Sequence, residues 1–118
     1  MTDKPIPYTE ETADLSALAL GFQGKRISFD WRPYHLRTAA ARADFDRLLV
    51  SIFHRGILKP LITYQGHVLI GQRRAEIGMR LHLGVVRVWE VQEDVSKWWK
   101  PDVARLAKLK AKMGEASY

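Results

Sequence analysis

The sequence predicts a single α+β domain in which short strands alternate with amphipathic helices, followed by a basic amphipathic helix at the C-terminus. Apolar residues recur first with a helical period, then with the alternation typical of strands, and then with a helical period again between residues 39 and 91. The chain has 118 residues, enough for one core but not comfortably for two. Its apolar share of 47% includes four tryptophans, which indicates a folded domain and not a disordered one.

Residues 1–24 are predicted to form an N-terminal extension. Asp14 is expected to cap a short helix that continues through Leu20 and ends at one of two nearby glycines. We expect this segment to pack on the domain, and contact with a partner is the alternative. Apolar and polar residues then alternate over residues 27–31, which predicts a half-buried strand.

The first long helix is expected over residues 39–55. Its core stripe has the i, i+3, i+4, i+7 spacing of an amphipathic helix and consists of Phe45, Leu48, Leu49 and Ile52. Gly56 is its expected end. The segment from Leu61 to Ile70 then reads as two short strands joined by a turn at Gln65–Gly66, because glycine accepts a positive φ.

From Gln72 the apolar pattern becomes helical, and Gly84 is expected to close this second helix. Alternation of Val86 and Val88 around Arg87 predicts the next strand. The candidate site is the helix start, which consists of Gly71, Gln72, Arg73 and Arg74. The first N–H groups of a helix are not bonded within it, and they carry the positive end of the helix dipole. Arginines in this first turn oppose the dipole, yet they suit a phosphate or another anion. Solvation of both arginines, or pairing with acidic residues, is the competing interpretation.

The last segment, residues 96–118, is predicted to contain a helix packed on the core or extending from it. Leu106, Leu109 and Met113 form its apolar seam. Its basic residues are Arg105, Lys108, Lys110 and Lys112. Such a helix can lie along DNA phosphates or bind an acidic partner, whereas a solvated face is the plainer interpretation.

Two motifs in order resemble the ParB N-terminal-like domain family, which shares its fold with sulfiredoxin. Ser51–Ile52 followed by Gly56–Leu61 looks like the first box of this family. Gly71–Arg74 looks like its second box, which usually reads Gly-Glu-Arg-Arg. The resemblance covers about residues 27–91 and implies a small mixed sheet flanked by helices, with a core domain over residues 25–95. The helix-turn-helix and dimerisation domains of partition proteins are not expected here, because too few residues follow Val91.

The resemblance also implies a nucleotide site. The residues that match the two boxes at this site are Ser51, Gly56, Lys59, Pro60, Gly71, Gln72, Arg73 and Arg74. The ligand implied is a nucleoside triphosphate such as CTP or ATP, accompanied by Mg²⁺. Gln72 replaces the usual glutamate of the second box, so hydrolysis is in greater doubt than binding.

Composition excludes several classes of function. The chain has no cysteine, which excludes disulfides, cysteine-ligated zinc and the sulfinic-acid repair of sulfiredoxin. Its four histidines lack the spacing of a metal motif, and no P-loop motif is present. Neither a membrane-spanning segment nor a signal peptide is recognised, so a cytoplasmic protein is expected. The net charge of +6 favours an anionic partner, while the oligomeric state stays open.

Three functions remain open on the sequence. The favoured one is a nucleotide- or DNA-phosphate-binding ParB-like domain of phage, plasmid or mobile-element type. The second is an enzyme of the same fold, either a nuclease or an NTP-dependent phosphotransferase, in which a carboxylate such as Asp30, Glu76 or Glu90 lies near the arginines. In the third, a non-catalytic regulatory protein binds DNA or a protein partner through the basic C-terminal helix.

Overall fold

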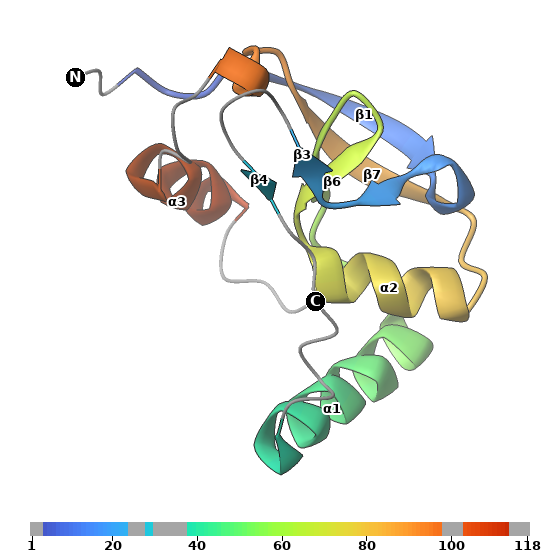
Figure 1. Ribbon diagram of the computed structural model, residues 1–118. Coiled ribbons are helices and arrows are strands. Elements are labelled where there is room, and N and C mark those ends of the chain that lie inside the picture. The colour runs from blue at the N-terminus through green and yellow to red at the C-terminus, as the bar shows by residue number, and fades with distance from the viewer. Residues whose placement is uncertain (1–3, 24–27, 30–37, 98–102, 114–118) are drawn as a thin grey trace.

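The computed structural model describes residues 4–23, 28–29, 38–97 and 103–113 (Figure 1). In these ranges the strands are β1 (Tyr8–Asp14), β2 (Ala19–Leu20), β3 (Phe22–Gln23), β4 (Ser28–Phe29), β5 (Leu61–Tyr64), β6 (His67–Ile70) and β7 (Val85–Val91). The α-helices are α1 (Ala39–Arg55), α2 (Gln72–Arg80) and α3 (Val103–Lys112). Two short 3-10 helices, η1 (Leu15–Ala17) and η3 (Val95–Lys97), join strands to their neighbours.

The main sheet has five strands in the order β1-β7-β5-β6-β2, and β3 pairs with β4 in a separate two-stranded sheet. Pairing is antiparallel between β1 and β7 and between β5 and β6, whereas β7 runs parallel to β5 and β2 runs parallel to β6. The predicted α+β class with a small mixed sheet is therefore confirmed.

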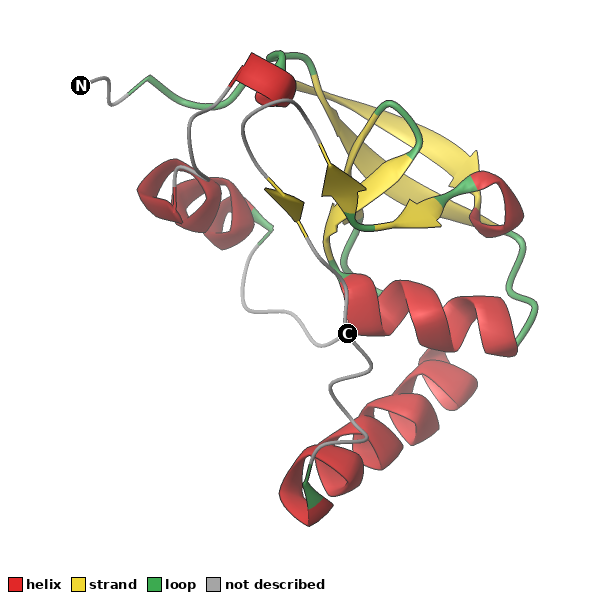
Figure 2. Ribbon diagram, in the orientation of Figure 1, coloured by secondary structure: helices red, strands yellow, loops and turns green. Residues whose placement is uncertain are grey.

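Helices cover both faces of this sheet, as Figures 1 and 2 show. Leu106 and Leu109 of α3 pack with Ile62, Trp89 and Val91 on one face. The opposite face is covered by α2, whose Ala75 packs with apolar side chains from β5, β6, β7 and η1. A third cluster joins α1 to α2 through Phe45, Leu48, Ile52 and Ile77, so that α2 lies between the sheet and α1.

The elements on either side of the candidate site follow the sequence pattern closely. The helix α1 has the predicted bounds, begins at a Thr38 cap whose hydroxyl accepts from Ala41 N at 3.0 Å, and ends at Gly56. The hairpin between β5 and β6 turns at Gln65 and Gly66, with φ of 47° and 81°. Two positive φ values are typical of the tight turn whose twist matches antiparallel strands.

The end of α2 differs from the prediction that Gly84 closes it. The helix stops at Arg80, and His82 takes the left-handed conformation with φ of 54°. Leu83 N donates to Gly78 O at 3.0 Å, and His82 N donates to Met79 O at 3.2 Å. This pair of bonds is the Schellman motif, which a non-glycine residue also completes. Gly84 instead lies in the turn before β7, with φ of 76°.

The N-terminal segment differs more. Asp14 does cap a helix, since its Oδ1 accepts from Ser16 N at 2.9 Å, but that helix is only the three-residue η1. The predicted continuation through Leu20 is wrong, because Ala19 and Leu20 pair with β6 instead. The strand β1 pairs with β7 along its whole length, so this segment shares the main sheet with the predicted core. Sheet pairing here outweighs a weak local helix preference.

Some expectations lie outside the described residues. Of the strand predicted over residues 27–31, only Ser28–Phe29 is described, and it forms β4. No helix in the described parts of the chain has the length and apolar character needed to span a membrane.

Candidate functional site

The main chain at the start of α2 has N–H groups that the helix itself does not bond. Gly71 occupies the N-cap position in the left-handed conformation, with φ of 100°, and no side chain caps this end. The first bond within the helix runs from Ala75 N to Gly71 O at 2.8 Å. The N–H groups of Gln72, Arg73 and Arg74 therefore have no partner within the helix, and they carry the positive end of its dipole.

Position 71 requires glycine for two reasons, its backbone conformation and the close packing around it. Its positive φ strains any side-chain-bearing residue. A Cβ atom there would lie 2.7 Å from Leu61 Cδ2 and 3.0 Å from Arg74 Nη2. The close packing of strand, helix and guanidinium at this point depends on the missing side chain.

Arg74 is largely buried, with 7% of its surface exposed. Its Nη1 donates to Lys59 O at 2.9 Å and to Pro60 O at 3.2 Å. Burial lowers the pKa of Arg74 to about 10, so that the group stays charged at neutral pH. This side chain therefore fastens the loop before β5 to the start of α2, a contact that the sequence did not predict.

Gln72 and Arg73 are both half-buried. The Gln72 Nε2 donates to Val68 O, which holds the side chain against β6. Its Oε1 is buried and has no hydrogen-bond partner among the described residues. The Gln72 amide is thus oriented by the strand, while Arg73 borders the cavity described next.

These groups line a cavity of about 380 Å³, called here the α2 pocket. Its lining consists of Leu48, Lys59, Ile70, Gly71, Gln72, Arg73, Arg74, Lys110 and Met113. Four of these residues are cationic, and none of the described lining residues is acidic. The α2 pocket therefore has the positive potential and the donor groups that bind phosphate or carboxylate.

Of the eight residues that the two motifs suggested, five line this pocket: Lys59 and the four residues of the helix start. The other three, Ser51, Gly56 and Pro60, are not among its lining residues. Ser51 is half-buried on α1, and Gly56 caps the end of that helix. Pro60 takes part indirectly, because its carbonyl accepts from Arg74.

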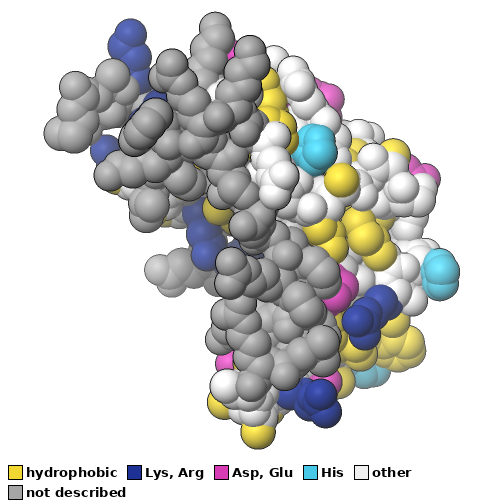
Figure 3. Space-filling view, in the orientation of Figure 1, with side chains coloured by type: hydrophobic (Ala, Val, Ile, Leu, Met, Phe, Trp, Pro, Cys, Tyr) yellow, Lys and Arg dark blue, Asp and Glu magenta, His cyan; other side chains and the backbone are white. Residues whose placement is uncertain are grey.

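The basic residues of α3 do not form one face. Lys110 lines the α2 pocket, whereas Arg105, Lys108 and Lys112 border a second cavity. This second cavity, called here the N-terminal cleft, has a volume of about 150 Å³ and is lined by Lys4, Pro5, Ile6, Arg105, Lys108, Leu109 and Lys112. On the face drawn in Figure 3, the coloured Lys and Arg side chains form separate patches.

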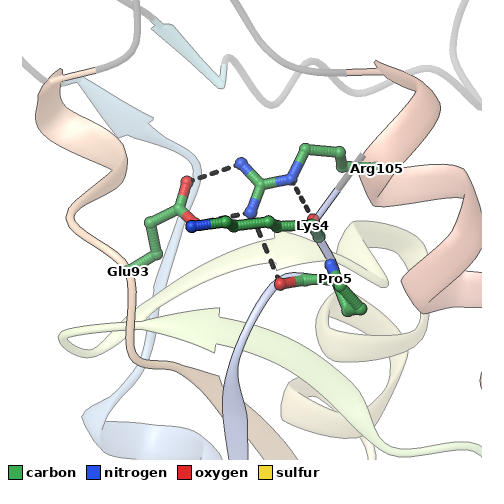
Figure 4. A network of polar contacts seen from close by, with 4 residues as sticks. All are labelled: Lys4, Pro5, Glu93 and Arg105. Atoms are coloured by element: carbon green, nitrogen blue, oxygen red, sulfur yellow. Dashed lines mark hydrogen bonds and ion pairs between the residues drawn. The ribbon is translucent and has the colours of Figure 1, made fainter. Parts of the chain in front are cut away.

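Arg105 already has protein acceptors on all sides of its guanidinium (Figure 4). Its Nη1 and Nη2 bond to the two carboxylate oxygens of Glu93 at 2.8 and 2.6 Å. Its Nε donates to Lys4 O at 2.7 Å, and Nη2 also reaches Pro5 O at 3.5 Å. This arginine joins α3 to the N-terminal segment and to the loop after β7, and these contacts occupy the donors that a nucleic-acid phosphate would need.

Of the carboxylates considered for catalysis, Glu76 and Glu90 do not line the α2 pocket. Glu90 accepts from Thr63 Oγ1 and from Gln65 N, both at 2.7 Å, at the hairpin between β5 and β6. Glu76 is buried and forms an ion pair with Arg80 at 3.5 Å. Asp30 lies outside the described residues. Across the described parts of the chain, no cluster of three acidic or histidine side chains has the geometry of a metal site.

Sequence reasoning missed Leu48, Ile70, Lys110 and Met113 as lining residues of the α2 pocket. For Lys110 a signal was present. On a helical period Lys110 falls on one flank of the Leu106–Leu109–Met113 seam, while the other three basic residues fall on the opposite flank.

The sequence matches no protein-family model, and a search of curated proteins gives no match. Solved structures do match. The structure of a Pnob8-like ParB-N domain aligns with a TM-score of 0.59 and 16% identity over 97% of this chain and 39% of that one. The C-terminally truncated chromosome-partitioning protein ParB from Caulobacter crescentus, complexed with CTP-gamma-S, aligns with a TM-score of 0.53 and 18% identity. That alignment covers 93% of this chain and 55% of that one. The chain therefore has the ParB N-terminal-like fold and spans about two fifths to just over half of the chains it resembles.

Proposed function

We propose that this chain, which has the ParB N-terminal-like fold, binds a nucleoside triphosphate through its phosphates in the α2 pocket. One observation carries the proposal: four cationic side chains converge on one cavity at a helix start that has no side-chain cap. A volume of about 380 Å³ lies in the range of small-molecule sites. In this site the N–H groups of the first turn and Arg73 hold phosphate oxygens, and Lys59 adds a point charge.

Arg74 has a different part in this proposal. Because its Nη1 is bonded to two carbonyls of the 59–60 loop, it acts as a positioning residue that keeps Lys59 beside the helix start. The apolar residues Leu48, Ile70 and Met113 provide the surface that a nucleoside needs beside its phosphates.

CTP is the first nucleotide to test, because the Caulobacter crescentus protein of the same fold was solved with a CTP analogue. The described pocket lining contains cations and no carboxylate, so it fits the anion better than a protein-held metal. Magnesium is therefore expected to act through the triphosphate that carries it. This lining also favours binding over hydrolysis, since no described carboxylate borders the pocket to act as a base.

Isothermal titration calorimetry with CTP, ATP, GTP and UTP, each with and without Mg²⁺, tests the proposal. We expect one or more nucleotides to bind, and Arg73→Ala to weaken that binding by about tenfold or more, the effect of losing a charge-assisted contact to phosphate. Arg42→Ala is the matched control, because it removes an exposed arginine of α1 that does not line the pocket.

A short DNA duplex, titrated at two salt concentrations, separates the two sources of phosphate. Binding of DNA that depends on Arg73 would place a phosphodiester in the α2 pocket. The contrary result is DNA binding whose affinity falls with added salt and is the same for Arg73→Ala and Arg42→Ala. The basic surface as a whole would then be responsible, and the proposal would be contradicted.

A further inference from the structure

The helix α3 supplies one wall of the α2 pocket. Lys110 of this helix and Met113, which directly follows it, line the cavity together with the start of α2. Met113 also packs against the core cluster that Ile70 joins, and Ile70 directly precedes Gly71. The C-terminal end of α3 is thereby seated beside the helix start, although the two elements are far apart in the sequence.

We infer that the ligand of the α2 pocket bridges α2 and α3, so that binding fixes α3 on the core and Lys110 contributes to affinity. The inference rests on the proposed function, because it concerns the same pocket. It extends that function to a residue outside both sequence motifs and makes the position of a whole helix depend on the ligand.

The two ends of α3 differ in the charges that surround them. Near its start, Arg105 is 11% exposed in its side chain and is bonded to Glu93 and to two carbonyls of the N-terminal segment (Figure 4). Near its end, Lys110 is exposed and faces a pocket that holds three other cations. Repulsion among these like charges raises the free energy of the docked end, and an anion bound between them removes that cost.

Ligand binding and helix docking are then coupled in both directions. An anion that contacts Arg73 and Lys110 together has a higher affinity for the state in which α3 is docked, so it shifts α3 toward that state. By the same linkage, a change that releases α3 from the core lowers the affinity of the α2 pocket for its ligand. Arg105 acts as a positioning residue in this scheme, because it holds α3 in place without lining the α2 pocket.

Hydrogen–deuterium exchange of the full chain, with sodium triphosphate and with CTP as probes, tests the coupling. In the unsubstituted chain we expect either probe to slow exchange of the α3 amides by about tenfold or more, as expected for a ligand well above its Kd. Lys110→Ala should weaken binding by about threefold to tenfold and remove most of this slowing, and Lys110→Arg should restore both.

Lys108→Ala is the matched control, since it removes one exposed lysine from the same helix at a position that borders the N-terminal cleft instead. It should leave both binding and exchange as in the unsubstituted chain. Equal behaviour of Lys110→Ala and Lys108→Ala, with binding that still depends on Arg73, would overturn the coupling and leave the proposed function standing. Absence of binding to the unsubstituted chain would overturn both.

Discussion

The α2 pocket and the N-terminal cleft are both concave, and four cationic residues border each of them, yet they differ in the acidic residues beside their cations. In the cleft, Arg105 is neutralised by the bidentate pair with Glu93 and by two main-chain carbonyls. In the pocket, cations surround a helix start whose N–H groups lack helix partners, and no described lining residue is acidic. The two cavities therefore have equal numbers of cationic residues and differ in the carboxylate that pairs with Arg105 in the cleft.

Two adjacent arginines at the start of α2 differ in their burial. Arg74 is buried and bonded to main-chain carbonyls, so it resembles Arg105 in its role, whereas Arg73 is half-buried beside the cavity. A structural arginine and a candidate ligand-binding arginine thus occupy neighbouring positions of one helix turn. Substitutions in the two regions should separate stability from binding.

The largest effect is expected at Gly71. Gly71→Ala should lower the free energy of unfolding by about 2 to 4 kcal/mol, since it adds backbone strain to a Cβ contact of 2.7 Å with Leu61. Gly66→Ala is the control, because Gly66 also has a positive φ, of 81°, but an added Cβ there would meet only Ala17 O, at 4.0 Å. It should cost only about 1 kcal/mol. Urea unfolding measures both, and equal losses would show that close packing at the pocket is unimportant.

The next largest effects on stability and binding are expected at Arg74 and Arg73. Arg74→Met should destabilise the fold by about 1 to 3 kcal/mol, because it leaves the carbonyls of Lys59 and Pro60 without their donor. Arg73→Met should destabilise the fold less than Arg74→Met does, because Arg73 is half-buried whereas Arg74 is buried, while it weakens nucleotide binding. Thermal unfolding and calorimetry on both variants check this division. A stable Arg74→Met protein with unaltered binding would remove Arg74 from any structural or positioning role.

In the N-terminal cleft, Arg105→Ala should destabilise the fold by about 1 to 2 kcal/mol, since Glu93 then loses its bidentate partner. Arg105→Lys should recover little of this, because an ammonium group cannot make the same planar pair of bonds. Chemical denaturation measures the loss. Full recovery with lysine would mean that charge alone, and not the guanidinium geometry, fastens α3.

The smallest effect is expected from the lysines of the cleft. The double variant Lys108→Ala and Lys112→Ala should bind triphosphate as the unsubstituted chain does at moderate salt, because neither side chain lines the α2 pocket. Calorimetry at two ionic strengths checks this. A large loss of affinity would show that the two cavities act as one electrostatic surface.

Much of the fold could be predicted because its signals are local. The stripe of Phe45, Leu48 and Ile52, the Gln65–Gly66 turn and the change of period at Gln72 each specify an element without knowledge of its neighbours. The strand β1 could not be found this way. It is an edge strand whose residues are mostly polar and exposed, and it is held by its pairing with β7.

The sequence predicted the residues at the helix start of the candidate site but not the pocket residues that come from other elements. Gly71–Arg74 stand together in the sequence, but the different directions of Arg73 and Arg74 depend on the packing of α2. Arg74 lies three and four residues before Ile77 and Gly78, which are both buried, and this spacing places it on the inner side of the helix. The helical period separates Lys110 from the other basic residues of α3, but its place beside the start of α2 depends on the position of α3, which no local pattern supplies.

A titration of ¹⁵N-labelled protein with CTP, followed by amide NMR spectra, tests the central claim most directly. If the helix start holds the phosphates, the largest shifts should fall on the amides of Gln72, Arg73 and Arg74, with smaller shifts at Lys59 and Lys110. Shifts concentrated instead at Lys4, Lys108 and Lys112, with the amides of the helix start unchanged, would contradict the account and assign binding to the N-terminal cleft.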